Sequence, residues 1–270
     1  MLKSNNLYLG DCLDLLAKIE DQTIDLVFLD PPYNLQLNKV LTRPNHSIVN
    51  GVNQDWDKFD SYSSYDDFTF SYLTECKRVL KPDGGLWIIG SYHNIFRIGK
   101  ILQDLNFWIL NDVIWAKSNP LPNFRATRLT NAHETLIWCS KKPKSKYQFN
   151  YHTLKVANED RQERSIWNFP ICSGKERLKN NKKQTAHPTQ KPLALMKKII
   201  IQSSIQGDLV LEPFAGTASF CAEAKYLGRN YIGFEKDEGY FNLAIKRLKK
   251  IKSLKNDLLE INEKDKPKQK

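Results

Sequence analysis

Residues 24–34 of the chain read IDLVFLDPPYN. The run Ile24–Leu29 is apolar except for Asp25, and two prolines follow directly after Asp30, a pattern typical of a buried parallel strand that ends at a turn. Similar apolar runs alternate with helix-like segments along most of the chain. This alternation predicts an α/β fold, namely a doubly wound, mainly parallel sheet with helices on both faces.

The remaining elements are predicted from the same periodicities. Further strands are expected over residues 7–10, 86–90, 107–115, 134–139, 208–211 and 231–234. Helices are expected over residues 13–19, 65–80, 95–105, 192–203, 220–227 and 240–251. Residues 34–64 lack a clear period and are expected to form a long loop, and the KPDGG segment at 81–85 is expected to end the helix before it.

The composition is that of a protein with a hydrophobic core. Of the 270 residues, 41% are hydrophobic and 26% are charged, which excludes the disordered and fibrous classes. No run approaches the roughly 18 apolar residues of a membrane span, and the first residues lack the layout of a secretory signal, so we expect a cytoplasmic protein. The five cysteines lie far apart and form no CxxC pair, so neither a disulfide framework nor a metal site is expected.

The net charge of +11 is unevenly distributed. Residues 1–116 hold 10 basic and 15 acidic residues, whereas residues 117–190 hold 15 basic and 5 acidic residues. Residues 191–245 are balanced, and residues 246–270 carry a net charge of +6. The basic middle segment is typical of a surface that faces phosphates, whereas the Lys-rich end is more typical of a solvated terminus.

These shifts divide the chain into four parts. Residues 1–116 form one half of the α/β domain, and residues 191–251 form the other half. Residues 117–190 form a basic region inserted between the halves, with one core strand at 134–139. Residues 252–270 form a Lys-rich C-terminal tail.

The residues directly after strand 24–29 are the first candidates for chemistry, because ligands of open α/β sheets bind beyond the carboxyl ends of the strands. The Asp30 carboxylate and the Pro31 carbonyl are two acceptors, and Tyr33 adds an aromatic plane. Together they can clamp a planar amine. The alternative is that the two prolines simply end the strand.

A second candidate loop reads LEPFAGTAS at residues 211–219, between an expected strand and an expected helix. Its small residues let a ligand approach the backbone, and the start of the helix favours a carboxylate group. The next expected strand ends in Glu235, about 20 positions on, where a carboxylate commonly holds ribose hydroxyls. A plain surface carboxylate is the alternative for Glu235.

Two smaller segments fit the same picture. Asp11 follows the first expected strand, where it is either a contact for an adenine edge or a simple helix cap. The HPTQKP segment at residues 187–192 opens a helix with hydroxyl, amide and ammonium groups, which suit an amino-acid head group. For His187 we favour a structural role, because the sequence places no metal ligand at a suitable spacing from it.

Taken together, DPPY, LEPFAG, GFE and HPTQKP resemble the motifs of S-adenosylmethionine-dependent DNA amino-methyltransferases. Their order is similar to that of the permuted, or beta, class, in which the catalytic strand precedes the cofactor loop. The segments DPPYNLQL, IGSYHNIFR, NAHETLIW and AHPTQKP resemble the cell-cycle-regulated and HinfI-type adenine methyltransferases in particular. The resemblance covers roughly residues 5–250.

This resemblance implies a Rossmann-like sheet of the seven-stranded type, in which residues 1–116 are the catalytic half, 117–190 the target-recognition region and 191–251 the cofactor-binding half. It also implies methyl transfer from S-adenosylmethionine to a flipped adenine in duplex DNA, within GANTC, by a homodimer. The implied catalytic residues are Asp30, Pro31, Pro32 and Tyr33. The implied cofactor contacts are Asp11, Cys12, Asp30, Lys191, Glu212, Phe214, Gly216 and Glu235.

The chain departs from the family pattern in two places. The cofactor loop is usually written DPFxGxGT, whereas Glu212, Ala218 and Ser219 replace Asp, the second Gly and Thr here. The cell-cycle members also carry an extra C-terminal domain that takes part in DNA recognition, where this chain has only its Lys-rich tail. The replacements in the cofactor loop are expected to bear on cofactor affinity. The Lys-rich tail, in place of a C-terminal domain, is expected to bear on the choice of target sequence.

The basic region mixes cations, which anchor phosphates, with asparagines, which read base edges. The DNA-binding candidates are Lys117, Asn119, Asn123, Arg125, Arg128, Asn131, Arg161 and Arg164. In the long loop, Trp56 is a candidate for contact with a base step, with packing against the domain as the alternative.

Three other functions are compatible with parts of the pattern. The first is a cytosine amino-methyltransferase, in which the corresponding four-residue segment usually begins with Ser. The second is an enzyme that modifies protein glutamine or RNA, in which that segment commonly begins with Asn. Asp30 at this position favours adenine over both. A DNA-binding protein without catalysis is the third, and the intact Asp30–Tyr33 segment argues against it. No residue pattern indicates whether a restriction endonuclease is a partner.

Overall fold

The computed structural model describes residues 2–35, 41–42, 48–49, 57–123, 125–179, 183–254 and 265. The apolar run quoted first forms strand β2 (Ile24–Leu29), inside an eight-stranded sheet with the order β1-β10-β9-β2-β5-β7-β6-β8. The other strands of this sheet are β1 (Asn6–Leu9), β5 (Leu80–Gly90), β6 (Trp108–Lys117), β7 (His133–Ser140), β8 (Ile166–Phe169), β9 (Leu209–Glu212) and β10 (Asn230–Glu235). The two-residue strands β3 (Leu41–Thr42) and β4 (Ile48–Val49) form a separate antiparallel pair.

The eight-stranded sheet is parallel except at β7, which pairs antiparallel with both β5 and β6. The prediction of a doubly wound, mainly parallel sheet is therefore confirmed. The sheet has eight strands and not the seven expected, because β8, where no strand was predicted, pairs in parallel with β6 at the edge.

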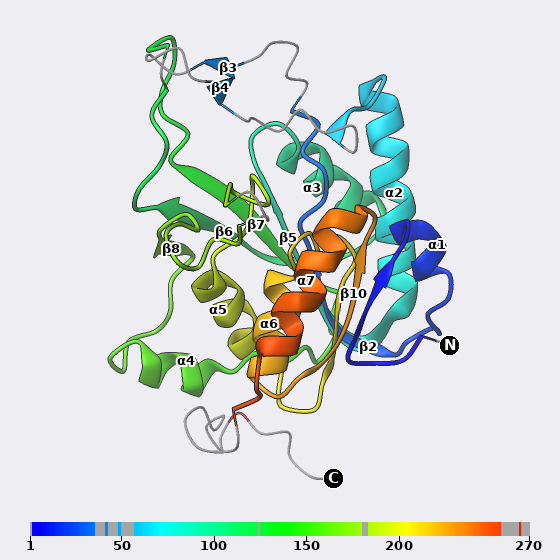
Figure 1. Cartoon of the computed structure of the whole chain (residues 1–270). Coiled ribbons are helices and arrows are strands. Elements are labelled where there is room, and N and C mark those ends of the chain that lie inside the picture. The colour runs from blue at the N-terminus through cyan, green and yellow to red at the C-terminus, as the bar shows by residue number, and fades with distance from the viewer. Residues whose placement is uncertain are drawn as a thin grey trace.

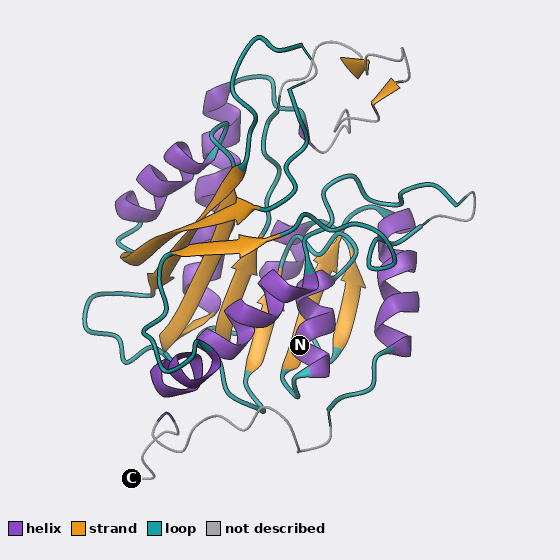
Figure 2. Cartoon of the chain, turned by 90° about the vertical axis from the view of Figure 1, so that its left-hand side faces the viewer, coloured by secondary structure: helices purple, strands orange, loops and turns teal. Residues whose placement is uncertain are grey.

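Helices cover both faces of the sheet (Figures 1 and 2). Helices α1 (Cys12–Leu16), α2 (Tyr62–Val79) and α3 (Ile95–Asp104) pack on one face, and α5 (Leu193–Ser203), α6 (Ser219–Tyr226) and α7 (Glu238–Lys250) pack on the other. Strand β2 shows the arrangement, because Leu26 and Phe28 join the core under α5–α7 while Val27 and Leu29 join the core under α1–α3. The strand is apolar nearly throughout because both of its faces are covered.

Helix α2 begins three residues earlier than the sequence predicted. Its start is fixed by a capping box, in which the Ser61 hydroxyl accepts from the Ser64 N–H at 3.0 Å and the Ser64 hydroxyl accepts from the Ser61 N–H at 3.1 Å. At the other end, β5 begins directly at Leu80, so the expected KPDGG stop lies within the strand and coincides with a shift in its register against β2.

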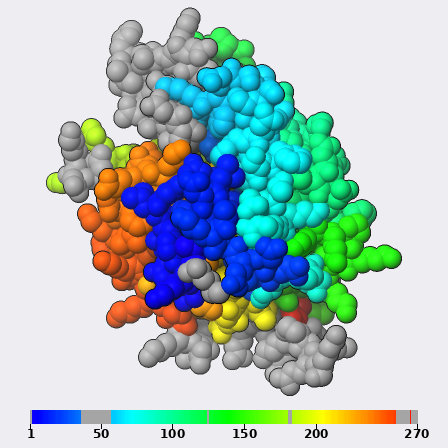
Figure 3. Space-filling view, turned by 90° about the vertical axis from the view of Figure 1, so that its right-hand side faces the viewer, coloured from blue at the N-terminus to red at the C-terminus, as the bar shows by residue number. Residues whose placement is uncertain are grey.

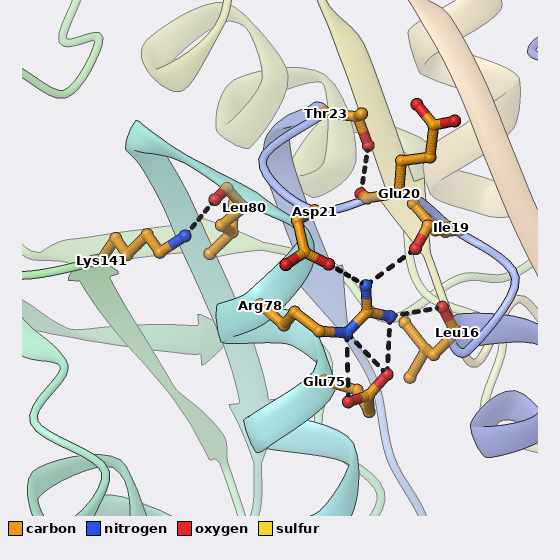
Figure 4. A network of polar contacts seen from close by, with 9 residues as sticks. All are labelled: Leu16, Ile19, Glu20, Asp21, Thr23, Glu75, Arg78, Leu80 and Lys141. Carbon is orange, nitrogen blue, oxygen red and sulfur yellow. Dashed lines mark hydrogen bonds and ion pairs between the residues drawn. The ribbon is translucent and has the colours of Figure 1, made fainter.

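Arg78 in the last turn of α2 ties this helix to the segment between α1 and β2 (Figure 4). Its guanidinium donates to the carboxylates of Glu75 and Asp21, at 2.7 and 2.6 Å, and to the carbonyls of Leu16 and Ile19. This network fixes how α2 packs beside α1.

The basic region is built into the sheet and does not form a lobe beside it. Both β7 and β8 come from this region, and so does α4 (Tyr151–Ala157), which packs next to α5. The rings of Trp87 and Trp138 stack at 5.3 Å, and Trp167 of β8 lies 5.5 Å from Trp87. Neither α4 nor β8 was predicted.

On the face drawn in Figure 3, the N-terminal residues (blue) lie between α2 (cyan) and the segment of β10 and α7 (orange). This position agrees with the parallel pairing of β1 and β10 and with the contacts of α1 against α2. Of the helices that the structure describes, none combines the length and the apolar character needed to cross a bilayer.

Candidate active site

A cavity of about 670 Å³ opens at the carboxyl ends of β1, β2, β9 and β10. This volume lies within the usual range for a small-molecule site. The cavity brings together every residue that was predicted to be catalytic or to hold a cofactor: Asp11, Cys12, Asp30, Pro31, Pro32, Tyr33, Lys191, Glu212, Phe214, Gly216 and Glu235. These residues come from four strand ends and one helix start, which meet because the four strands run in the same direction.

The loop after β2 is held by a carboxylate that the sequence did not single out. Asp57 accepts hydrogen bonds from the N–H groups of Tyr33, Asn34 and Leu35, at 2.6, 2.8 and 3.0 Å. Asn34, between the other two donors, has a φ of +53°, in the left-handed region. Asp57 therefore fixes a backbone conformation that the loop adopts only with support.

Two further side chains hold the proline step from the other side. The Tyr65 hydroxyl donates to the Pro32 carbonyl at 2.9 Å, and the Asn94 amide donates to the Tyr65 hydroxyl at 3.2 Å. Both side chains are buried. The neighbouring Pro31, whose carbonyl was predicted to accept from an amine, lies on the cavity wall beside this support.

A cluster of charges surrounds Asp30. The Lys191 ammonium lies 2.8 Å from the Asp30 carboxylate and 3.7 Å from that of Glu134. Glu134 also pairs with Lys117 at 2.7 Å and accepts a hydrogen bond from the Tyr33 hydroxyl at 2.9 Å. Two carboxylates and two ammonium groups thus meet at the edge of the cavity.

Burial and neighbouring charges shift the protonation of these groups in opposite directions. Burial raises the pKa of Asp30, and Lys191 offsets only part of that effect. Burial acts the same way on Glu134, but Lys191 and Lys117 outweigh it and hold the pKa of Glu134 below its ordinary value. Burial disfavours the Lys191 ammonium, yet the two carboxylates outweigh it and raise the pKa of Lys191. Of the two carboxylates in the cluster, Asp30 is therefore the one that takes up a proton more readily.

Two carboxylates hold the LEPFAG loop at the cavity, the buried Glu212 of β9 and the half-buried Glu235 at the end of β10. Glu212 accepts from the N–H groups of Phe220 and Cys221 at the start of α6, at 3.3 and 2.9 Å, and burial raises its pKa to about 7. These two donors were predicted to favour a ligand carboxylate, but Glu212 occupies them. Glu235 accepts from the Gly216 N–H at 2.6 Å, and burial raises its pKa to about 7 as well.

The backbone of this loop is left-handed at two nearby positions. Gly216 has a φ of +52°, and a Cβ there would lie 3.2 Å from the His187 ring, so both the backbone conformation and this contact favour glycine. Ala218 has a φ of +54° at the position where the family pattern has glycine. Arg247 of α7 donates to the Thr217 carbonyl and to the Ser219 hydroxyl, both at 3.0 Å, and so supports the loop from behind.

Asp11 and His187 each have a structural contact in addition to a place on the cavity wall. Asp11 caps α1 by accepting from the Leu13 N–H at 3.0 Å and pairs with Lys236 at 3.0 Å. The buried His187 ring packs edge-on against Tyr240 at 4.4 Å. Burial and nearby cations lower the pKa of His187 to about 3, so its ring is neutral near pH 7.

The predicted DNA-binding residues fall into three groups. Lys117 belongs to the charged cluster, and the Asn119 side chain accepts from the Ile171 N–H at 2.7 Å. Asn123 holds the loop between β6 and β7 by accepting from the Arg125 N–H and donating to the Arg128 carbonyl. The candidates on the exposed surface are Asn119, Arg125, Arg128, Asn131, Arg161 and Arg164.

The loop between β6 and β7 projects beyond the carboxyl edge of the sheet, the edge that holds the cavity (Figure 1). Within it, the Arg128 guanidinium donates to the Tyr92 hydroxyl at 2.7 Å and lies over that ring. Trp56 lies outside the described residues, and so does the C-terminal tail except for residues 252–254 and 265.

Sequence reasoning missed Glu134 and Asp57. Neither side chain follows the end of a predicted strand, since Glu134 stands at the start of β7 and Asp57 at the far end of the long loop. The signal for Glu134 was present, because one charged residue directly precedes the apolar run Thr135–Cys139 of a predicted strand.

Comparison with known proteins places this geometry in a family. Residues 24–246 match the N6/N4 methyltransferase family described as DNA methylase. The type II methyltransferase M.HinfI of Haemophilus influenzae is 51% identical over 254 residues, which cover 94% of this chain and 71% of that protein. The type II methyltransferase M2.MboI of Moraxella bovis is 40% identical over 257 residues, covering 94% and 92% of the two chains.

Solved structures agree with this assignment. The crystal structure of an M1.HpyAVI–SAM complex has 28% sequence identity and a TM-score of 0.64, covering 90% of this chain and 98% of that one. The cytosine-N4-specific PvuII DNA methyltransferase shares the fold with a TM-score of 0.69 at 19% identity, covering 96% and 89%. The chain therefore belongs to the DNA methylase family of N6 and N4 methyltransferases and is a DNA methyltransferase.

Proposed function

We propose that this enzyme methylates the exocyclic amino group of an adenine in double-stranded DNA, within the sequence GANTC. S-adenosylmethionine is the methyl donor, and when bound it supplies a methyl group carried on a positively charged sulfur. The observation that carries the proposal is the juxtaposition of Asp30, Pro31 and Tyr33 on one cavity wall.

The cavity offers a group for each part of this cofactor. The Glu235 carboxylate suits the ribose hydroxyls, Asp11 suits the adenine edge, and Lys191 suits the carboxylate of the amino-acid end. Cys12, Phe214 and Gly216 complete the walls, and Gly216 lets the backbone approach closely. Glu212 acts from behind the loop, since its carboxylate is used by the start of α6.

The mechanism needs the target base outside the DNA stack, because the amino group is unreachable inside it. Tyr33 stacks on the flipped adenine. Asp30 and the Pro31 carbonyl accept its two amino hydrogens, which directs the nitrogen lone pair to the methyl group and stabilises the positive charge that develops on the amine. Catalysis then depends on holding nitrogen, carbon and sulfur in line, which is an effect of orientation. The amine nitrogen would take the methyl group as the bond between that carbon and sulfur breaks, and the methylated amine would then release one proton to solvent.

Adenine is favoured over cytosine by the residue at position 30. The cytosine amino-methyltransferases usually have Ser where this chain has Asp30, and the segments around DPPYNLQL and AHPTQKP resemble the HinfI-type adenine enzymes. The 51% identity to M.HinfI supports the same choice. The resemblance to the HinfI type also supports GANTC as the target.

The exposed cations of the basic region form the proposed DNA surface. Arg125, Arg128, Arg161 and Arg164 are exposed and can meet phosphates or guanine edges, with Asn131 in the same region. Lys117, Asn119 and Asn123 hold this surface in place through the contacts given above.

Further properties follow from the family resemblance. We propose the permuted class, because Asp30–Tyr33 precedes the 211–219 loop in the chain. We also propose that the enzyme is a homodimer. The type II relatives support a role in restriction–modification. We propose that it acts on DNA in the cytoplasm.

Transfer of a tritiated methyl group tests this function. Duplex DNA with GANTC sites is expected to take up label that is recovered as N6-methyladenine, whereas protein and RNA take up none. Asp30→Ala is expected to abolish transfer while DNA binding persists. Recovery of N4-methylcytosine, or an active Asp30→Ala enzyme, would contradict the proposal.

A further inference from the structure

Glu134 contacts three other groups at the edge of the cavity. Only 12% of its side chain is exposed, and its carboxylate is shared by the Lys117 ammonium at 2.7 Å, the Tyr33 hydroxyl at 2.9 Å and the Lys191 ammonium at 3.7 Å. Nothing in the proposed chemistry uses this carboxylate directly. A buried charge destabilises the folded protein unless its partners compensate. A role in the reaction would explain why this carboxylate is kept at the edge of the cavity.

The position of Lys191 creates a conflict at Asp30. Lys191 lies 2.8 Å from one Asp30 oxygen and therefore competes for the carboxylate that accepts the target amine. Its positive charge also opposes the charge that develops on that amine during transfer. The same ammonium is 3.7 Å from Glu134, so a movement of about 1 Å brings it to hydrogen-bonding distance there.

We propose that Glu134 is a positioning residue for methyl transfer, which draws the Lys191 ammonium away from Asp30 as the target amine binds and holds Tyr33 by its hydroxyl. The proposal rests on the function proposed above, in which Asp30 accepts an amino hydrogen of the base. Lys117 pairs with the Glu134 carboxylate at 2.7 Å, so Glu134 can form an ion pair with Lys191 while Lys117 still holds it in place.

The charged and titratable groups that act on Asp30 are Lys191, Glu134 and Tyr33, and those that act on Glu134 are Lys191, Lys117 and Tyr33. Glu134→Gln keeps an acceptor for the Tyr33 hydroxyl but removes the charge. Asp30 is then the one carboxylate of the cluster left to pair with Lys191, and the negative charge of Glu134, which raises the pKa of Asp30, is gone. Both changes lower the pKa of Asp30.

The first experiment measures methyl transfer against pH for the wild type, Glu134→Gln and Glu134→Asp. We expect Glu134→Gln to lower kcat by roughly 100-fold, as for a misplaced catalytic group, and to move the acid limb of the profile to lower pH. Glu134→Asp keeps the charge and is expected to restore the position of the limb. A purely structural role would lower the rate at every pH and leave the limb where it is, which would overturn the proposal.

The matched control is Glu75→Gln, which breaks a half-buried Glu–Arg pair on α2, outside the cavity (Figure 4). It is expected to leave both kcat and the pH profile unchanged. If it changes the profile as Glu134→Gln does, the effect is not specific to the cluster and the proposal is wrong.

The second experiment does not depend on activity. The 13C carboxyl signal of Asp30 is titrated in the protein without substrates, and its midpoint is expected at lower pH in Glu134→Gln than in the wild type. An unchanged midpoint would overturn the inference about Glu134. A wild-type enzyme that labels no DNA would contradict the proposed function instead, while this titration would still decide the inference.

Discussion

Asp57→Ala is expected to disturb the loop that carries Tyr33. The Asp57 side chain is nearly inaccessible, with 3% of the residue exposed, and three backbone N–H groups donate to it at 2.6–3.0 Å. A hydrogen bond to a charged group contributes about 1.5–3 kcal/mol, so three contribute roughly 4.5–9 kcal/mol before other effects are counted.

Part of this gain is offset by the cost of burying the carboxylate. Burial raises the pKa of Asp57, which indicates that its charged form is poorly solvated in the folded protein. Water can also satisfy some of the freed N–H groups. We therefore expect Asp57→Ala to lower the free energy of unfolding by about 3 kcal/mol, and Tm by about 6–12 °C for a protein of this size.

The assay combines urea and thermal unfolding with single-turnover methyl transfer at a temperature at which the variant is folded. The transfer rate is expected to fall by about 100-fold, because Tyr33 and the left-handed Asn34 are no longer supported. Asp83→Ala is the matched control, since its exposed carboxylate accepts one backbone N–H, that of Lys146, and removing it should cost less than about 1 kcal/mol. An Asp57→Ala enzyme that has the same Tm as Asp83→Ala and transfers the methyl group at the wild-type rate would refute this reasoning.

Three further predictions concern the cofactor loop and the DNA surface. Gly216→Ala is expected to weaken S-adenosylmethionine binding and to cost about 1–2 kcal/mol of stability, because φ is +52° and the new Cβ meets the His187 ring; calorimetric titration and urea unfolding measure both. Glu212 keeps its proton up to about pH 7 in the folded protein, whereas it loses it near pH 4.5 in the unfolded chain. The free energy of unfolding therefore falls as pH rises between these two values. Glu212→Gln is expected to remove about 3 kcal/mol of this fall, as measured by urea unfolding at pH 4.5 and 7. Replacing Arg125 and Arg128 with Ala is expected to reduce the slope of log K for DNA against log salt by about one unit for each phosphate that the protein no longer neutralises, and an unchanged slope would remove these residues from the DNA surface.

Much of the cavity wall could be predicted because one rule about parallel sheets places it. Asp30 directly follows the apolar run that became β2, Glu235 ends the run that became β10, and Asp11 follows β1 after one glycine. Strands that run in the same direction bring their carboxyl ends to one edge, so residues far apart in the chain meet there. The apolar runs were long enough to be read without knowledge of their neighbours.

The rule failed where the sheet departs from it. Glu134 reaches the same edge from the beginning of a strand, because β7 runs in the opposite direction, and no local pattern in the sequence distinguishes a reversed strand. Asp57 reaches Tyr33 by tertiary contact across the long loop. Strand β8 has only four residues, IWNF, in polar surroundings, so its place in the sheet depends on Trp167 packing near Trp87.

The reversed strand also affects the order in which the active site can form during folding. Strands β6 and β7 are consecutive and antiparallel, so Lys117 and Glu134 are brought together by closing the single loop of residues 118–132. Asp30 and Lys191 meet only after segments separated by more than half of the chain have come together, which carries a larger entropic cost and is slower. We expect the hairpin to present Glu134 before Lys191 arrives, so that catalytic competence is gained late and a partly folded enzyme does not methylate DNA.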